Sequence, residues 1–147
     1  MQFLPAVSIA ALALASLLTA ADNPPSAVWV DHEKVAAAIV AGSVMVSQPG
    51  VTVQGGHRTG PGQTEIHEKE TDVIYVIEGE ATMVTGGTVI GNKQTAPGQF
   101  RGTSIEGGKT QRLTKGDVIV IPAGTPHWFK AVVAPAVNYY VVKAVKP

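Results

Sequence analysis

The clearest structural signal in the sequence is Gly116-Asp-Val-Ile-Val-Ile-Pro-Ala-Gly-Thr-Pro-His127, a strand followed by a sharp turn. The apolar run Val118 to Ile121 is short and rich in β-branched residues, which predicts a strand buried on both faces. Pro122 cannot donate to a neighbouring strand and Gly124 tolerates a positive φ, so the two residues end the strand and turn the chain. His127 then opens the next strand just past the turn.

A second segment, Glu65 to Gly79, carries polar side chains at regular spacing. Glu65 and His67 are two residues apart, so on a strand both side chains point to the same face. Asp72 follows after a four-residue turn and opens the next strand, and Gly79 comes seven residues later.

The two segments resemble the two sequence motifs of the cupin superfamily. The second motif, G-x5-P-x-G-x2-H, is matched position for position up to His127. In the first motif Glu65 stands at the first histidine, His67 at the second and Asp72 at the glutamate. The resemblance implies a small, single-domain, all-β protein, a double-stranded β-helix (jelly roll, or cupin barrel). It also implies that Glu65, His67, Asp72 and His127 meet near one end of the barrel.

Such a set of side chains predicts a divalent metal ion at the barrel mouth. Two imidazoles and two carboxylates suit Fe, Mn, Zn or Ni and leave open positions for water or substrate. Two inward carboxylates without a cation would repel each other in a desolvated pocket, which favours metal binding. The alternative is a site that has lost metal binding, in which Glu65 and Asp72 are polar residues exposed to solvent at the barrel mouth.

Further residues are candidates for a pocket around this site. His57 lies ten residues before His67 and is a candidate substitute for the missing histidine. Arg58 is a bidentate donor for a substrate carboxylate or for Glu65. Ile74 and Phe129 share strand parity with Asp72 and His127, which predicts that they line an apolar pocket.

The stretch 80–115, between the two motifs, is long and rich in glycine. It predicts either a surface hairpin with a loop or a lid over the barrel mouth. In the second interpretation Phe100 and Arg101 lie above the pocket and control the entry of a ligand.

The amino terminus predicts a secretory signal peptide over residues 1–21. No charged side chain occurs before Asp22, and the nearly unbroken apolar run Ala6 to Leu18 precedes the small residues of Thr19-Ala-Ala21. We therefore expect cleavage after Ala20 or Ala21 and an exported protein, either periplasmic or extracellular. An uncleaved membrane anchor is the alternative, but the run is shorter than the ~20 residues of a bilayer span and no basic cluster follows it.

Residues 22–42 predict a linker and one short helix, and residues 43–147 predict the cupin domain. Asp31 suits the helix cap and Gly42 suits a left-handed residue at its end. Beyond the helix, short β-rich runs separated by glycine and proline predict ten strands. They are 43–47, 51–54, 63–67, 73–77, 81–85, 88–90, 110–113, 117–121, 127–133 and 137–142.

Composition narrows the functions further. The 11 basic and 11 acidic residues balance, so the charge gives no reason to expect a nucleic-acid partner. Cysteine is absent, which excludes disulfides and thiolate chemistry. Two function classes remain: a metal-dependent cupin dioxygenase, isomerase or decarboxylase of a small molecule, and a non-catalytic cupin that binds a small ligand or a metal. The resemblance also implies a homodimer that covers the sheet edges, with the segment 27–30 as a candidate contact.

Overall fold

The computed structural model describes residues 26–145, and that part of the chain begins with its one helix, α1 (His32–Ala41). Asp31 caps α1, because its side chain accepts a 2.9 Å hydrogen bond from the backbone N–H of Lys34. Gly42 ends the helix in the left-handed conformation, with a φ of 64°. The predicted helix is therefore confirmed at both ends. The predicted signal peptide, residues 1–21, lies outside the described residues.

Strands make up most of the remainder of the described chain. They are β1 (Val44–Gln48), β2 (Val51–Arg58), β3 (Thr64–His67), β4 (Glu70–Thr85), β5 (Thr88–Ile90), β6 (Lys93–Ala96), β7 (Gln99–Gly102), β8 (Ser104–Glu106), β9 (Lys109–Thr114), β10 (Val118–Ile121) and β11 (His127–Val145).

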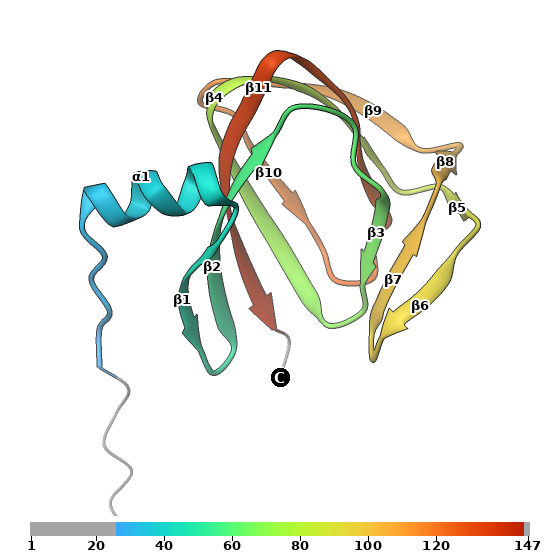
Figure 1. Cartoon of the computed structure of the whole chain (residues 1–147). Helices are drawn as coiled ribbons and strands as arrows, with labels where there is room; N and C mark the ends of the chain where they lie inside the picture. The colour runs from blue at the N-terminus through green and yellow to red at the C-terminus, as the bar shows by residue number, and fades with distance from the viewer. Residues whose placement is uncertain (1–25, 146–147) are drawn as a thin grey trace, which may run out of the picture.

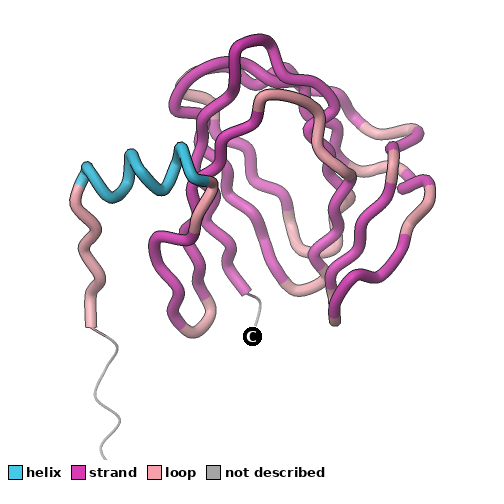
Figure 2. The backbone as a smooth tube through the Cα atoms, in the orientation of Figure 1, coloured by secondary structure: helices cyan, strands magenta, loops and turns pink. Residues whose placement is uncertain are grey.

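These strands wrap into the jelly roll that the sequence predicts, with α1 on the outside (Figures 1 and 2). The long strands β4 and β11 pair with each other along most of their length. Two pairs of predicted strands are therefore continuous, since 73–77 and 81–85 belong to β4, and 127–133 and 137–142 to β11. Gly79 joins the two halves of β4 with a φ of 84°, and a Cβ there would lie 2.1 Å from the carbonyl oxygen of Ala136.

The stretch between the motifs forms short strands. β6 and β7 make a hairpin, and β7 extends the barrel wall by pairing with β3 (Figure 1). This pairing places Arg101 opposite Glu65. β5 and β8 form a separate two-stranded sheet. Of the two interpretations of this stretch, the architecture agrees with the hairpin.

Helix α1 rests on the outer face of β2 and determines which of its residues face the barrel interior. A Cβ at Gly55 would lie 2.4 Å from the carbonyl oxygen of Ala38, so only glycine allows the helix to approach this closely. Gly56 points the other way, where a Cβ would lie 2.2 Å from the ring of Tyr139. Strand alternation then turns Arg58 into the barrel and leaves His57 outside.

The apolar core fills the barrel interior below the polar end. It consists of Ile74, Val76, Ala81, Met83, Leu113, Ile121, Phe129, Val137, Tyr139 and Val141. Along β4 this core begins directly after Asp72, because Ile74 and Val76 share its strand parity. The site residues therefore sit at the end of a packed core that holds their strands in place.

Strand β10 differs from its prediction, because only one of its faces is buried. Val118 and Val120 are 58% and 57% exposed, whereas Ile121 belongs to the core. β10 pairs only with β4, and no element of residues 26–145 covers its outer face. An uninterrupted apolar run thus predicted the strand correctly and its burial wrongly.

Candidate metal centre and its pocket

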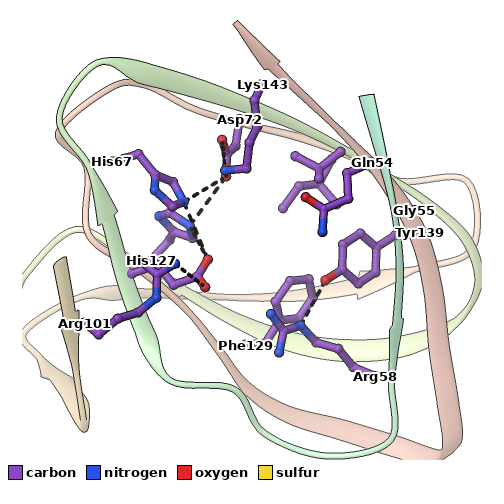
Figure 3. Close-up of a pocket in the computed structure, with 13 residues that line it drawn as sticks. Gln54, Gly55, Arg58, His67, Asp72, Arg101, His127, Phe129, Tyr139 and Lys143 are labelled. Carbon is purple, nitrogen blue, oxygen red and sulfur yellow. Dashed lines mark hydrogen bonds and ion pairs between the residues drawn. The ribbon is translucent and has the colours of Figure 1, made fainter. Parts of the chain in front are cut away.

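The barrel brings together the four residues that the sequence singles out. β3 supplies Glu65 and His67, β4 supplies Asp72, and β11 supplies His127 directly opposite Glu65. Figure 3 shows His67, Asp72 and His127 turned toward one another. The Nε2 atom of His67 lies 3.6 Å from an oxygen of Glu65 and 3.6 Å from Oδ2 of Asp72. The Nε2 atom of His127 lies 3.4 Å and 3.6 Å from the same two oxygens. Two imidazole nitrogens and two carboxylate oxygens therefore face one small space.

Each histidine makes a hydrogen bond through the Nδ1 atom, and this bond orients the ring so that Nε2 faces the space between the carboxylates. His67 Nδ1 contacts the side-chain oxygen of Gln99, and His127 Nδ1 lies 3.1 Å from the backbone carbonyl of Thr125. Because both partners are acceptors, each Nδ1 carries the proton, and each Nε2 of the neutral ring presents a lone pair. Metal-binding histidines are oriented in this same way by an acceptor behind the ring.

Both Nε2 atoms are buried and have no hydrogen-bond donor among the described residues. His67 and His127 are only 4% and 3% exposed. A buried lone pair that faces carboxylate oxygens is unfavourable unless a proton or a cation lies between them. The donor set therefore fits a metal cation.

Two overlapping groups of side chains have the spacing of metal ligands. In the first, ligand atoms of Glu65, His67 and His127 lie within 4.8 Å of one another; in the second, those of His67, Glu70 and Asp72 do. The first group is a set of two histidines and one carboxylate, as in sites that bind divalent transition metals with open positions. Glu70 was not predicted from the sequence.

Asp72 is also held by a lysine. Lys143 Nζ lies 2.9 Å and 3.0 Å from the two oxygens of Asp72 (Figure 3). The same atom lies 3.5 Å from Glu70. Glu65 has a cation of its own, since Arg101 Nη2 lies 3.4 Å from Oε1. Each of the two carboxylates at the site is therefore paired with a basic side chain.

These contacts change the acidity of the site. Burial alone would raise the pKa of Glu65, but the contacts of its carboxylate with the His127 and His67 imidazoles and the charge of Arg101 outweigh burial and hold that pKa well below its usual range. Burial and the charge of Lys143 would lower the pKa of His67, but its contact with Glu65 and the charge of Asp72 prevail and raise that pKa. In the absence of a metal, Glu65 thus stays ionised and His67 gains affinity for a proton.

A cavity of about 170 Å³ opens beside the two histidines. Of the predicted pocket residues, Arg58, Ile74, Arg101 and Phe129 line it. Gln54, Tyr139, Val141 and Lys143 also line it, and the sequence analysis did not find them. Alternation within β11 places Tyr139, Val141 and Lys143 on one face but does not tell which face is the inner one, and Gln54 lies on β2.

His57 and Phe100 do not line the cavity, contrary to prediction. His57 is exposed on the outer face of β2, where its Nδ1 atom lies 2.7 Å from the side-chain oxygen of Asn138. Phe100 lies between Gln99 and Arg101 on β7, so alternation turns it outward while its neighbours turn inward. Gln99, which holds His67, takes the inward position that the sequence analysis did not foresee.

The sequence profile of the family described as cupin matches residues 58–147, more than half of the chain. The chain belongs to the cupin family. The matched region contains β3 to β11 and therefore all four residues of the candidate metal centre. Among curated proteins, none matches the sequence.

Solved structures with the same architecture include other cupins. The cupin domain of Schizosaccharomyces pombe Cnp3 has 13% sequence identity and a TM-score of 0.52, covering 71% of this chain and 59% of that one. An uncharacterized protein with a double-stranded beta-helix domain from Klebsiella pneumoniae has 19% identity and a TM-score of 0.52, covering 69% of each chain. Oxalate oxidase has 18% identity and a TM-score of 0.48, covering 66% of this cupin and 43% of that chain. This cupin thus spans less than two thirds of the Cnp3 and oxalate oxidase chains, and the two likenesses with a TM-score of 0.52 show the fold alone.

Within residues 26–145, no helix has the length and apolar character needed to cross a membrane.

Proposed function

We propose that this cupin binds a divalent metal ion, Fe, Mn, Zn or Ni, through Glu65, His67, Asp72 and His127, and binds or transforms a small organic molecule in the adjoining cavity. One observation carries the proposal: the buried Nε2 atoms of His67 and His127 face the same carboxylate oxygens and have no donor among the described residues. A cation satisfies both lone pairs at once.

The side chains around the site supply the remaining functions. Gln99 and Thr125 hold the two imidazoles in the ligand orientation. When bound, the metal supplies Lewis acidity and a template for the ligand. Glu65 and Asp72 are the carboxylates that reach the histidines, and either one not bound to the metal is a base for proton transfer. Ile74 and Phe129 keep part of the cavity wall apolar.

A second candidate function is supported by Lys143. Its ammonium group contacts both oxygens of Asp72 and already supplies a positive charge beside the histidines. This contact favours a metal-free cupin that binds a small ligand without catalysis. In that case a proton on His67 or His127, rather than a metal, lies between imidazole and carboxylate.

Metal analysis of the protein purified from its native host separates the two candidates. Stoichiometric Fe, Mn, Zn or Ni supports the metal centre, and iron or manganese in particular supports an enzyme. Protein that contains no metal and takes none up from any of the four salts contradicts the metal proposal. It leaves the metal-free binder.

We also propose that the protein is exported after cleavage behind Ala20 or Ala21, on the basis of the apolar amino-terminal run. Mass spectrometry of the protein from its native host tests the proposal. A chain that begins at Ala21 or Asp22 in the periplasmic or extracellular fraction supports export. An intact Met1 in the cytoplasmic fraction contradicts it.

A further inference from the structure

The cavity beside the histidines has one more cation than carboxylates. Three basic side chains, Arg58, Arg101 and Lys143, line it together with two acidic ones, Glu65 and Asp72. Arg101 pairs with Glu65 and Lys143 with Asp72. The remaining positive charge belongs to Arg58.

Arg58 is held in place without being neutralised. Its Nε atom donates a 3.0 Å hydrogen bond to the hydroxyl of Tyr139, and its guanidinium carbon lies 4.9 Å from the ring centroid of Phe129. It forms no ion pair with a carboxylate of residues 26–145, and its two terminal nitrogens have no protein acceptor there. Burial raises the pKa of Tyr139 and outweighs the opposing charge of Arg58, so the hydroxyl stays neutral.

An ordered, half-buried guanidinium with free donors on a cavity wall is built to pair with an anion. Fixing the side chain in advance removes much of the entropy that a flexible cation would lose on binding. The planar fork matches the two oxygens of a carboxylate. Inorganic phosphate fits less well, because the other two cations of the cavity are already paired with Glu65 and Asp72.

The rest of the cavity defines the body of the ligand. Figure 3 shows Arg58, Phe129 and Tyr139 on the opposite side of the pocket from His67 and Lys143. Phe129, Ile74 and Val141 line the same cavity and are 5%, 3% and 7% exposed. At about 170 Å³ the cavity is smaller than the 300–1,000 Å³ of typical drug-sized ligand sites.

We propose that Arg58 anchors the carboxylate of a short organic acid, whose apolar middle lies against Phe129 and Ile74 and whose far end carries an oxygen function near His67 and His127. Dicarboxylic, hydroxy and keto acids of a few carbons have this chemistry. The inference rests on the proposed function for the far end of the ligand, whereas the anchor itself is a property of Arg58.

The experiment measures the binding of malonate, succinate and butyrate by ligand-observed NMR, with malonamide and inorganic phosphate as comparison ligands. Titrations use wild type, Arg58→Met, Arg58→Lys and Arg112→Met, each with and without zinc. Methionine keeps an apolar stem beside Phe129. Arg112 is a matched control, because it is an arginine with a 70% exposed side chain outside the cavity. Circular dichroism melts establish that each variant is folded.

Wild type should bind at least one acid more tightly than malonamide or phosphate. Arg58→Met should weaken that binding about tenfold or more, since a hydrogen bond to a charged group contributes ~1.5–3 kcal/mol. Arg58→Lys should retain part of the affinity and Arg112→Met all of it. The anchor is overturned if no acid binds, if phosphate binds more tightly than every acid, or if Arg58→Met and Arg112→Met behave alike.

Zinc affinity, measured separately by calorimetry, distinguishes failure of the anchor from failure of the metal site. Arg58→Met should bind zinc as wild type does, because Arg58 contacts none of the four proposed ligands. If wild type binds zinc but no acid, the metal site stands and the anchor is wrong. If wild type binds neither zinc nor Mn, Fe or Ni, the metal site is wrong. Loss of acid binding in metal-free Arg58→Met then still supports the anchor, and unchanged binding refutes it.

Discussion

His127→Ala should remove most of the stabilisation that a bound metal gives to the fold. His127 supplies one of the two buried lone pairs of the centre, and no other imidazole of the described chain lies close enough to replace it. His57, the only candidate substitute in the sequence, is on the outer face of β2. The variant therefore leaves a single imidazole in the site.

The size of the effect follows from mass action. A metal at one hundred times its Kd stabilises the folded state by about 2.7 kcal/mol. For a domain of this length each kcal/mol raises the Tm by roughly 3–5 °C, so the wild-type Tm should rise by about 10 °C. Loss of even an outer partner of a metal ligand costs 10–100-fold in affinity. With a 100-fold loss in His127→Ala, the same metal concentration stabilises by only about 0.4 kcal/mol, or ~1–2 °C.

The assay is a thermal melt with and without Mn, Fe, Ni and Zn salts. The compared quantity is the metal-dependent shift in Tm, because removing a buried side chain also changes the stability of the metal-free protein. His57→Ala is the matched control, since it removes an exposed imidazole outside the cavity and should keep the full shift. A wild-type Tm indifferent to all four metals, or a full shift in His127→Ala, would refute the reasoning.

Four further predictions concern Lys143, the pH dependence of stability with and without metal, and assembly. Lys143→Met should raise zinc affinity in calorimetry about tenfold, because an ammonium 2.9 Å from Asp72 repels the incoming cation by at least ~1 kcal/mol; weaker binding would show that Lys143 instead positions Asp72. The metal-dependent shift in Tm should fade as pH falls, starting above the ordinary histidine pKa of ~6.5, because the pKa of His67 is raised by its contacts with Glu65 and Asp72 against the effect of burial. The stability of the metal-free protein should depend on pH in the opposite direction. Protonated His67 stabilises the fold below pH ~6.5, and melts should show this stabilisation lost as pH rises through its raised pKa. Light scattering should detect the expected homodimer, and Val120→Lys, on the exposed face of edge strand β10, should dissociate it; a wild-type monomer at high concentration contradicts the dimer.

The sequence predicted those features that depend on local chemistry. Asp31 caps the start of α1 with its side chain, and Gly42 ends the helix in the left-handed conformation. Both signals are local, and the structure confirms both. The alternation of Glu65 and His67 likewise needs only the geometry of one strand. The resemblance of the two motifs to those of cupins predicted that β3, β4 and β11 come together at the site. No local rule predicts this arrangement.

Features that depend on pairing between strands were not predicted. Lys143 and Tyr139 enter the cavity because β11 runs on through irregular pairing between Val133 and Asn138, which sets the register of its second half. Such a shift changes which residues face inward, and single-sequence periodicity does not detect it. The lid interpretation places Phe100 together with Arg101 above the pocket. Residues 99–102 instead form strand β7, whose alternation turns Phe100 outward while Arg101 faces the cavity.

The structure also changes the reason for expecting a metal. From the sequence, two inward carboxylates required a cation to prevent their repulsion, yet Arg101 and Lys143 already neutralise Glu65 and Asp72. Charge balance alone therefore does not require a metal. The two imidazoles do require an electrophile, because acceptors behind the rings direct both Nε2 lone pairs toward carboxylate oxygens. A proton on each ring or a single metal ion satisfies that arrangement, and the metal ion satisfies both rings at once. For this reason the histidine variants, and not the carboxylate variants, are the decisive test of the site.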